Sequence, residues 1–227
     1  AEGTSSEEFY QIYHKFGYDQ AVSRASDSLS YVYRLDEKYW LMMLDSCMCE
    51  PVHETGGKLS EETTAWMKMQ LEEAKKQGVT VIPVSHHNLL DESILYPEEC
   101  TIENTKEVTA LLEAYGVPVY LSGHLHLQRI KKHTSNLNTP GGYGIREIVT
   151  SPLPMAPCQY SILNWQADGS LSYHTKKVDI AGWAQRYGEE DENLLNFDAY
   201  ADQFLVDVIS EQAFKALQSA SKDIKEE

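Results

Sequence analysis

The chain has 227 residues, of which 42% are hydrophobic and 24% are charged, as is typical of a globular protein with one or two domains. Its formal net charge of -16 repels the backbone of a nucleic acid duplex, which excludes duplex binding as a main role. The same charge would repel a phosphate ester unless cations were held at the reaction site. No apolar run reaches the roughly 18 residues that cross a bilayer, so the sequence predicts no membrane span.

The first half of the chain predicts a helix, a hairpin and then alternating helices and strands. A capped amphipathic pattern predicts a helix that ends at Gly17, and two β-rich runs joined by a short turn predict a hairpin over 30–35 and 39–44. Two further helices begin at Ser60 and at Asn104 or Thr105, and a short apolar run follows each (helices 60–77 and 104–115, strands 79–84 and 117–121). This order predicts an α/β unit with parallel strands.

The second half changes in character after residue 144. Strands are predicted over 144–150, 159–165 and 170–178, the last two joined by a turn at 167–169. An acidic helical stretch follows, with helical periodicity over 199–217. We therefore expect one domain over residues 1–179 and a helical C-terminal region over residues 180–227.

The four cysteines give little information on their own. Their even number permits three disulfide pairings, but a chain with this much core needs no disulfides for stability. Cys47 and Cys49 lack the spacing of a zinc knuckle or a redox-active pair. We interpret these two, with Cys100 and Cys158, as small buried residues, and the sequence leaves their disulfide status open.

Three histidines follow two of the predicted strands. His86 comes directly after the run that ends at Val84-Ser85, and His124 and His126 come directly after Leu121-Ser122-Gly123. Ligands bind in the crevice beyond the carboxyl ends of the strands in open α/β sheets. A single histidine in this position is usually a structural residue, but three at two matched strand ends predict metal ligands.

The local spacing refines this prediction. Residues two apart share a face in an extended chain, and Gly123 allows the backbone to approach a ligand closely. Clustered neutral imidazoles suit zinc, manganese or iron. His87 should point away from its neighbour His86, so we expect it to face the substrate or to support the site rather than to bind metal.

These residues carry a resemblance to a known family. Val-Ser-His-His-Asn at 84–88 and Leu-Ser-Gly-His-Leu-His at 121–126 resemble the last two motifs of the calcineurin-like metallophosphoesterases. Segments 8–19, 29–31 and 148–151 further resemble a bacterial subgroup that is similar to class III cyclic nucleotide phosphodiesterases and carries a C-terminal helical region. The resemblance implies the C-terminal half of a four-layer α/β/β/α sandwich, followed by helices. It slightly favours an exported or cell-surface location, which the residues themselves leave unknown.

The resemblance also implies a reaction and a set of site residues. Such enzymes hold two divalent or trivalent metal ions (Mn, Fe or Zn), and a bridging hydroxide attacks phosphate monoesters or diesters, cyclic nucleotides among them. Position by position, His86 and His124 resemble ligands of one ion and His126 a ligand of the other. His87 is the candidate catalytic residue. Asn88 and Arg129 are candidate substrate contacts, and the alternative for Arg129 is a solvated charge at a loop exit.

The upstream motifs of the family are absent from all 227 residues. The sequence contains no Asp-x-His, no Gly-Asp pair and no Asn-His pair. We therefore expect a fragment whose missing partner is the N-terminal half of the same domain, with weak metal binding and negligible activity by itself. Two alternatives stay open: a non-catalytic binding or scaffold module that has kept the fold, and a mononuclear zinc hydrolase with three histidine ligands.

Overall fold

The computed structural model describes residues 4–49, 54–91, 98–133, 144–166 and 168–226. The chain divides into two compact units, residues 1–150 and residues 151–227. The predicted domain boundary at residue 180 is untested by this division and stays a prediction. None of the helices within the described ranges is long and apolar enough to cross a bilayer.

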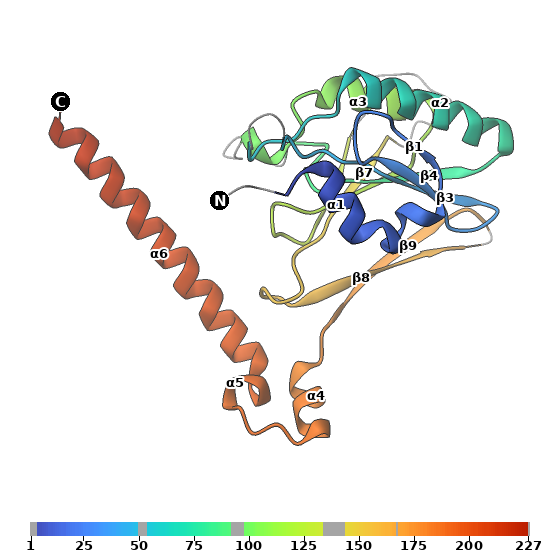
Figure 1. Cartoon of the computed structure of the whole chain (residues 1–227). Helices are drawn as coiled ribbons and strands as arrows, with labels where there is room; N and C mark the ends of the chain where they lie inside the picture. Colours follow the sequence, from blue (N-terminus) through green and yellow to red (C-terminus); the bar gives the residue numbers. More distant parts are fainter. Residues whose placement is uncertain (1–3, 50–53, 92–97, 134–143, 167, 227) are drawn as a thin grey trace. The chain divides into compact units, whose positions relative to one another are not determined.

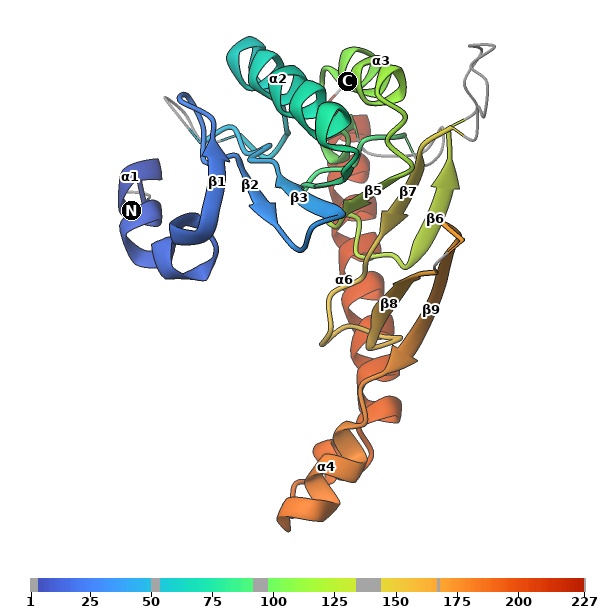
Figure 2. The ribbon, with the colours of Figure 1, turned by 90° about the vertical axis from the view of Figure 1, so that its right-hand side faces the viewer.

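The described residues of the first unit form a mixed sheet (Figure 2). In spatial order its strands are β1 (Ala21–Arg24), β2 (Tyr31–Arg34), β3 (Tyr39–Met43), β4 (Thr80–Val84), β5 (Val119–Ser122), β7 (Arg146–Val149) and β6 (Arg129–Lys132). Strands β3, β4, β5 and β7 are parallel to one another, and antiparallel strands flank them on both sides. The predicted α/β class with parallel strands is therefore confirmed.

The hairpin between β2 and β3 forms where the sequence predicts it. The Asp36 carboxylate accepts hydrogen bonds from the backbone N–H groups of Lys38 (2.7 Å) and Tyr39 (2.9 Å), which closes the turn. The register then pairs Val32 with Met42, and both side chains are fully buried. One face of the β2–β3 hairpin is therefore part of the core.

The helices of the first unit are α1 (Ser6–Tyr13), two 3₁₀ turns (His14–Phe16 and Tyr18–Gln20), α2 (Glu61–Gln77), a third 3₁₀ turn (Glu98–Cys100) and α3 (Thr105–Ala114). Helices α2 and α3 lie on the same face of the sheet (Figures 1 and 2). Ser60 caps α2 by accepting a hydrogen bond from the N–H of Thr63 (2.9 Å), and Gly78 ends it in the left-handed conformation. Both ends of α2 therefore agree with the prediction.

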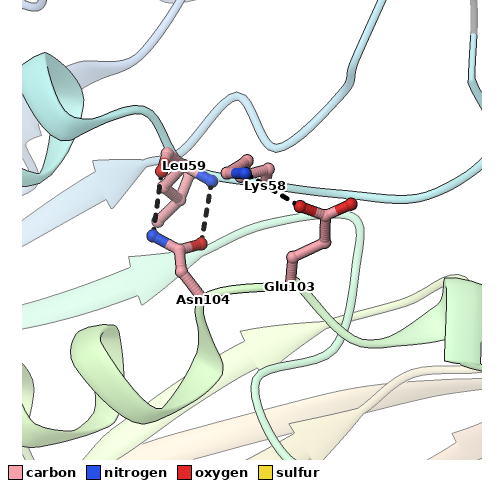
Figure 3. Close-up of polar contacts among 4 residues, drawn as sticks. All are labelled: Lys58, Leu59, Glu103 and Asn104. Atoms are coloured by element: carbon pink, nitrogen blue, oxygen red, sulfur yellow. Dashed lines mark hydrogen bonds and ion pairs between the residues drawn. The ribbon is translucent and has the colours of Figure 1, made fainter.

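Asn104 has a different role from the helix cap that its position predicts. Helix α3 begins after it, but its side chain makes no capping hydrogen bond. Instead, the amide bonds the backbone of Leu59 twice: Oδ1 accepts from the N–H (3.2 Å) and Nδ2 donates to the carbonyl (2.9 Å) (Figure 3). Lys58 and Glu103 form an ion pair beside it (2.9 Å). The residues before α2 are thereby fixed to the start of α3.

The core of the first unit lies between the sheet and these two helices. Its apolar members from the strands are Val32, Trp40, Met42, Val81 and Tyr120, and those from the helices are Trp66, Met67, Leu71, Ala74, Val108 and Leu112. Burial of these side chains is the main term that favours this arrangement.

The second unit contains a two-stranded hairpin and helices. Strands β8 (Gln159–Trp165) and β9 (Leu171–Lys177) pair antiparallel, as predicted, with Gln159 opposite Lys177. The helices are α4 (Ile180–Tyr187), α5 (Glu192–Leu195) and α6 (Phe197–Glu226). The Asp179 carboxylate caps α4 by accepting from the N–H of Gly182 (2.9 Å). The predicted helical C-terminal region is confirmed.

Candidate metal centre

The two histidine-bearing turns begin where parallel neighbouring strands end. Val84 of β4 pairs with Leu121 of β5, and the chain leaves the sheet just beyond both residues. Backbone hydrogen bonds continue past this pair, from the N–H of Ser85 to the carbonyl of Leu121 (3.0 Å) and from the N–H of Gly123 to the carbonyl of His86 (3.0 Å). The turns are therefore joined along their backbones.

The imidazoles of His86 and His124 meet at this edge. Nε2 of His86 lies 2.8 Å from Nδ1 of His124, and the two ring centroids are 4.8 Å apart. The rings meet nearly edge to face, with an interplanar angle of 88°. At this distance one ring donates its N–H to the lone pair of the other, so the two imidazoles from separate turns meet in a hydrogen bond, as their convergence in the sequence prediction requires. This contact does not test metal ligation.

The second turn has an unusual backbone. His124 and His126 both have positive φ angles, 57° and 56°. The left-handed region is unfavourable for residues with a Cβ, and such residues gather at functional sites. The extended conformation expected for this segment is therefore wrong: two left-handed residues, rather than strand alternation, direct these side chains.

Burial and neighbouring imidazoles weaken protonation of this pair. Loss of water around each ring lowers the pKa of His86 and of His124 below the ordinary value of 6.5. The nearby rings of His87 and His126 lower the pKa of both residues further, because adjacent imidazolium charges repel. Both rings are therefore neutral at pH 7, the form that can donate a lone pair to a metal ion. His126 itself is exposed.

His87 is buried next to the pair, with 3% of its surface exposed. Its Nε2 lies 3.0 Å from the carbonyl of Thr55, and its Nδ1 lies 2.8 Å from Oγ of Ser46. A carbonyl can only accept, so Nε2 carries the proton and, in the neutral ring, Nδ1 accepts from the Ser46 hydroxyl. The ring centroid is 4.8 Å from that of His124. His87 is thus held against the candidate site, and its predicted catalytic role stays a prediction.

The two candidate substrate contacts lie in different surroundings. Asn88 is fully buried, and its amide donates to Oγ of Ser122 (2.9 Å) and to the carbonyl of Gly123 (3.3 Å). This side chain therefore joins the two histidine-bearing turns, which the sequence analysis did not predict. Arg129 is exposed at the start of β6. Contact of either residue with a substrate stays a prediction.

A cavity of about 730 Å³ adjoins His86 on the first unit. It is lined by side chains from the ends of β3 and β4, from the loop after β3, from α1 and from the 3₁₀ turn Tyr18–Gln20. Among them are Met43, Val84, Asp45, Phe9 and Tyr18. Its walls are mixed, with aromatic rings beside carboxylates. Asp45 was not predicted as a site residue, because an isolated Asp after a strand is a common pattern.

Two of the cysteines also line this cavity. Cys47 and Cys49 are exposed free thiols, whereas Cys100 and Cys158 are buried free thiols. The interpretation of all four as buried is therefore wrong for the first two, which lie on the open loop after β3. Partial burial and the negative charge of Asp45 raise the pKa of Cys47 to about 11, so this thiol stays protonated and weakly reactive near neutrality.

The donor atoms fit a metal ion in part. His86 and His124 supply two nitrogens at one point, but the described part of the chain contains no group of three histidine, cysteine or acidic side chains arranged to hold an ion. Protein metal sites of this kind normally use at least three protein ligands. The chain therefore offers a partial donor set.

The fold and this edge define an α/β protein with paired imidazoles at the carboxyl ends of parallel strands. Residues 179–227 match the family described as the C-terminal domain of cyclic nucleotide phosphodiesterase. This match over the C-terminal segment supports the predicted relation to the phosphodiesterases.

Comparison with other proteins gives a further structural match. A dimetal phosphatase from Danio rerio is 14% identical, with a TM-score of 0.45, and the match covers 57% of this chain and 52% of that structure. The chain thus spans about half the length of that protein. No curated protein matches the sequence.

Proposed function

We propose that this chain supplies the downstream donors of a dinuclear metallophosphoesterase centre. The observation that carries the proposal is the 2.8 Å approach of His86 Nε2 to His124 Nδ1 at the ends of two parallel strands. Structural packing alone does not require two neutral imidazoles to meet at a surface edge, nor does it require left-handed backbone at His124. The phosphodiesterase match over the last 49 residues (179 to 227) supports the same assignment.

The proposal gives each histidine a role. His86 and His124 hold one ion, and His126 contributes to the other. When bound, two metal ions supply Lewis-acid charge and an activated nucleophile for attack on phosphorus. The remaining donors come from a segment outside these 227 residues, because the carboxylate and asparagine motifs of the family are absent from the sequence. Zinc, manganese and iron all suit imidazole ligands.

Other residues of the chain shape the surroundings of that centre. His87, fixed by Ser46 and Thr55, packs against the ring of His124 and limits its orientation. The cavity beside His86 receives the organic part of a phosphate ester, and a cyclic nucleotide is the substrate that the C-terminal match favours. Arg129 is the candidate contact to the phosphate.

Metal content and turnover of two polypeptides test the proposal. The first is the 227-residue chain, and the second is the longer reading frame that contains it. We expect weak zinc binding and no phosphodiester hydrolysis from the first. From the second we expect two bound ions and metal-dependent hydrolysis of bis(p-nitrophenyl) phosphate that His124→Ala abolishes.

Two other outcomes would contradict the proposal. One tightly bound zinc ion in the 227-residue chain would indicate a mononuclear hydrolase. A longer polypeptide that folds but neither binds metal nor turns over would indicate a binding or scaffold module.

A further inference from the structure

A buried carboxylate lies between the two histidine-bearing turns. Glu147 is on β7 and has 0% of its surface exposed. Its Oε1 accepts hydrogen bonds from the N–H of Leu89 (2.6 Å) and from Oγ of Ser122 (2.7 Å), and its Oε2 accepts from the N–H of Leu90 (2.7 Å). One side chain therefore bonds both the segment that follows His86 and the residue two before His124.

Burying this carboxylate has a cost in folding free energy, which suggests that the acid is present for a specific role. Removing a carboxylate from water is expensive, and the three hydrogen bonds mainly offset that cost. The neighbouring residues of β7, Ile148 and Val149, are apolar and buried, and an apolar residue at position 147 would fit the same strand. A stable strand therefore does not require the acid.

The hydrogen bonds of Glu147 continue to the backbone that carries the histidines. The hydroxyl of Ser122 donates to Glu147 and accepts from the amide of Asn88 (2.9 Å), which also donates to the carbonyl of Gly123 (3.3 Å). His86 is thus two residues from Asn88, and His124 is one residue from Gly123. The turns share an anchor on a third strand, in addition to their own backbone contact.

We propose that Glu147 is a positioning residue that holds the turn of His86 in register with the turn of His124. It acts through the backbone N–H groups of Leu89 and Leu90 and through the hydroxyl of Ser122. The inference rests on the proposed function for its purpose, which is to bring two metal donors together before an ion arrives. The structural part of the inference is that Glu147 keeps the rings of His86 and His124 close together, and this part does not depend on a metal ion.

Nuclear magnetic resonance on the metal-free chain tests the geometry. The reporter is the ring-to-ring cross-peak of His86 and His124, whose centroids are 4.8 Å apart, and the internal reference is the cross-peak of Phe9 and Tyr13, whose centroids are 4.5 Å apart. Glu147→Leu keeps the side-chain size and removes every acceptor, so we expect loss of the reporter peak with the reference unchanged. Glu147→Gln keeps one carbonyl oxygen and should restore part of it.

A matched control separates positioning from general stability. Leu112→Ala removes a fully buried side chain from the core without touching either turn, and it should keep the reporter peak. If Glu147→Leu fails to fold, Glu147→Gln and Ser122→Ala carry the test, and each should weaken the peak. A full-strength peak in a folded Glu147→Leu chain, or in both milder variants, overturns the inference.

A separate zinc titration distinguishes this inference from the proposed function. Displacement of a ligand by about 1 Å is enough to weaken a site strongly, so we expect the zinc affinity of the Glu147→Leu chain to fall about tenfold or more. Loss of the reporter peak together with no zinc binding by the unaltered chain would leave the positioning role standing and remove the proposed function. Retained zinc affinity together with a retained peak would remove the positioning role.

Discussion

Gly57 is the position where one added methyl group should disturb the site most clearly. A Cβ atom at Gly57 would lie 2.4 Å from Cγ and 2.5 Å from Nδ1 of His87, about 1 Å inside ordinary contact. The near end of a buried ring cannot swing away as the tip of a flexible side chain can. Gly57→Ala must therefore displace His87 or the loop that carries the glycine.

The expected change in the free energy of unfolding follows from the contacts that His87 loses in Gly57→Ala. Overpacking costs about 1–3 kcal/mol, and release of the hydrogen bonds to Ser46 and Thr55 costs about 1 kcal/mol each. Alanine also restricts the unfolded chain, which stabilises the folded state by about 0.4–1 kcal/mol. This gain applies because the φ angle of Gly57 is not positive and therefore suits alanine. We expect a net loss of about 2–5 kcal/mol in the free energy of unfolding.

The neighbouring glycine provides the control. A Cβ atom at Gly56 would meet only the terminal carbon of Met48, at 3.3 Å, and that end of the side chain can move. Gly56→Ala should therefore leave the free energy of unfolding within about 1 kcal/mol of the unaltered chain. Urea denaturation measures both variants. Equal stability of the two would refute the packing of His87 described above.

Two further predictions concern backbone conformation and the link shown in Figure 3. Because His124 has a φ of 57°, the His124→Gly variant should be about 1 kcal/mol more stable than His124→Ala in urea denaturation. His86 lacks a positive φ, so at that position the glycine variant should be no more stable than the alanine variant. The same order at both positions would contradict the left-handed assignment. Asn104→Ala should lower the free energy of unfolding by about 2 kcal/mol, because it removes two hydrogen bonds to the backbone of Leu59. Lys58→Ala should lower it by less than about 1 kcal/mol, because the ion pair of Lys58 is exposed. A larger effect of Lys58→Ala in hydrogen exchange or urea denaturation would reverse that ranking of the two contacts.

Most of the sheet could be predicted, because its central strands carry strong local signals. Short apolar runs bounded by capped helices predict β4 and β5, and two β-rich runs around a turn predict the hairpin of β2 and β3. Strands β1 and β6 were not predicted. The four residues of β6, Arg-Ile-Lys-Lys, are mostly charged, and only pairing with β7 makes them a strand.

The histidine pair could be predicted, whereas the residues that hold it could not. His86 and His124 follow recognisable strand ends, and general α/β topology brings those ends together. Glu147 left only a weak signal, a single acid in an apolar strand, and nothing in the sequence indicates which amides it bonds. The close approach of Gly57 to His87 likewise depends on a loop packing against a distant turn, which no local pattern records.

Crystals of the 227-residue chain soaked with zinc would show whether the imidazoles of His86 and His124 bind a metal ion together. We expect an anomalous density peak in contact with Nε2 of His86 and Nδ1 of His124, the two atoms that lie 2.8 Å apart without metal. A peak elsewhere on the chain, or the two side chains turned away from each other with no zinc between them, would contradict this expectation.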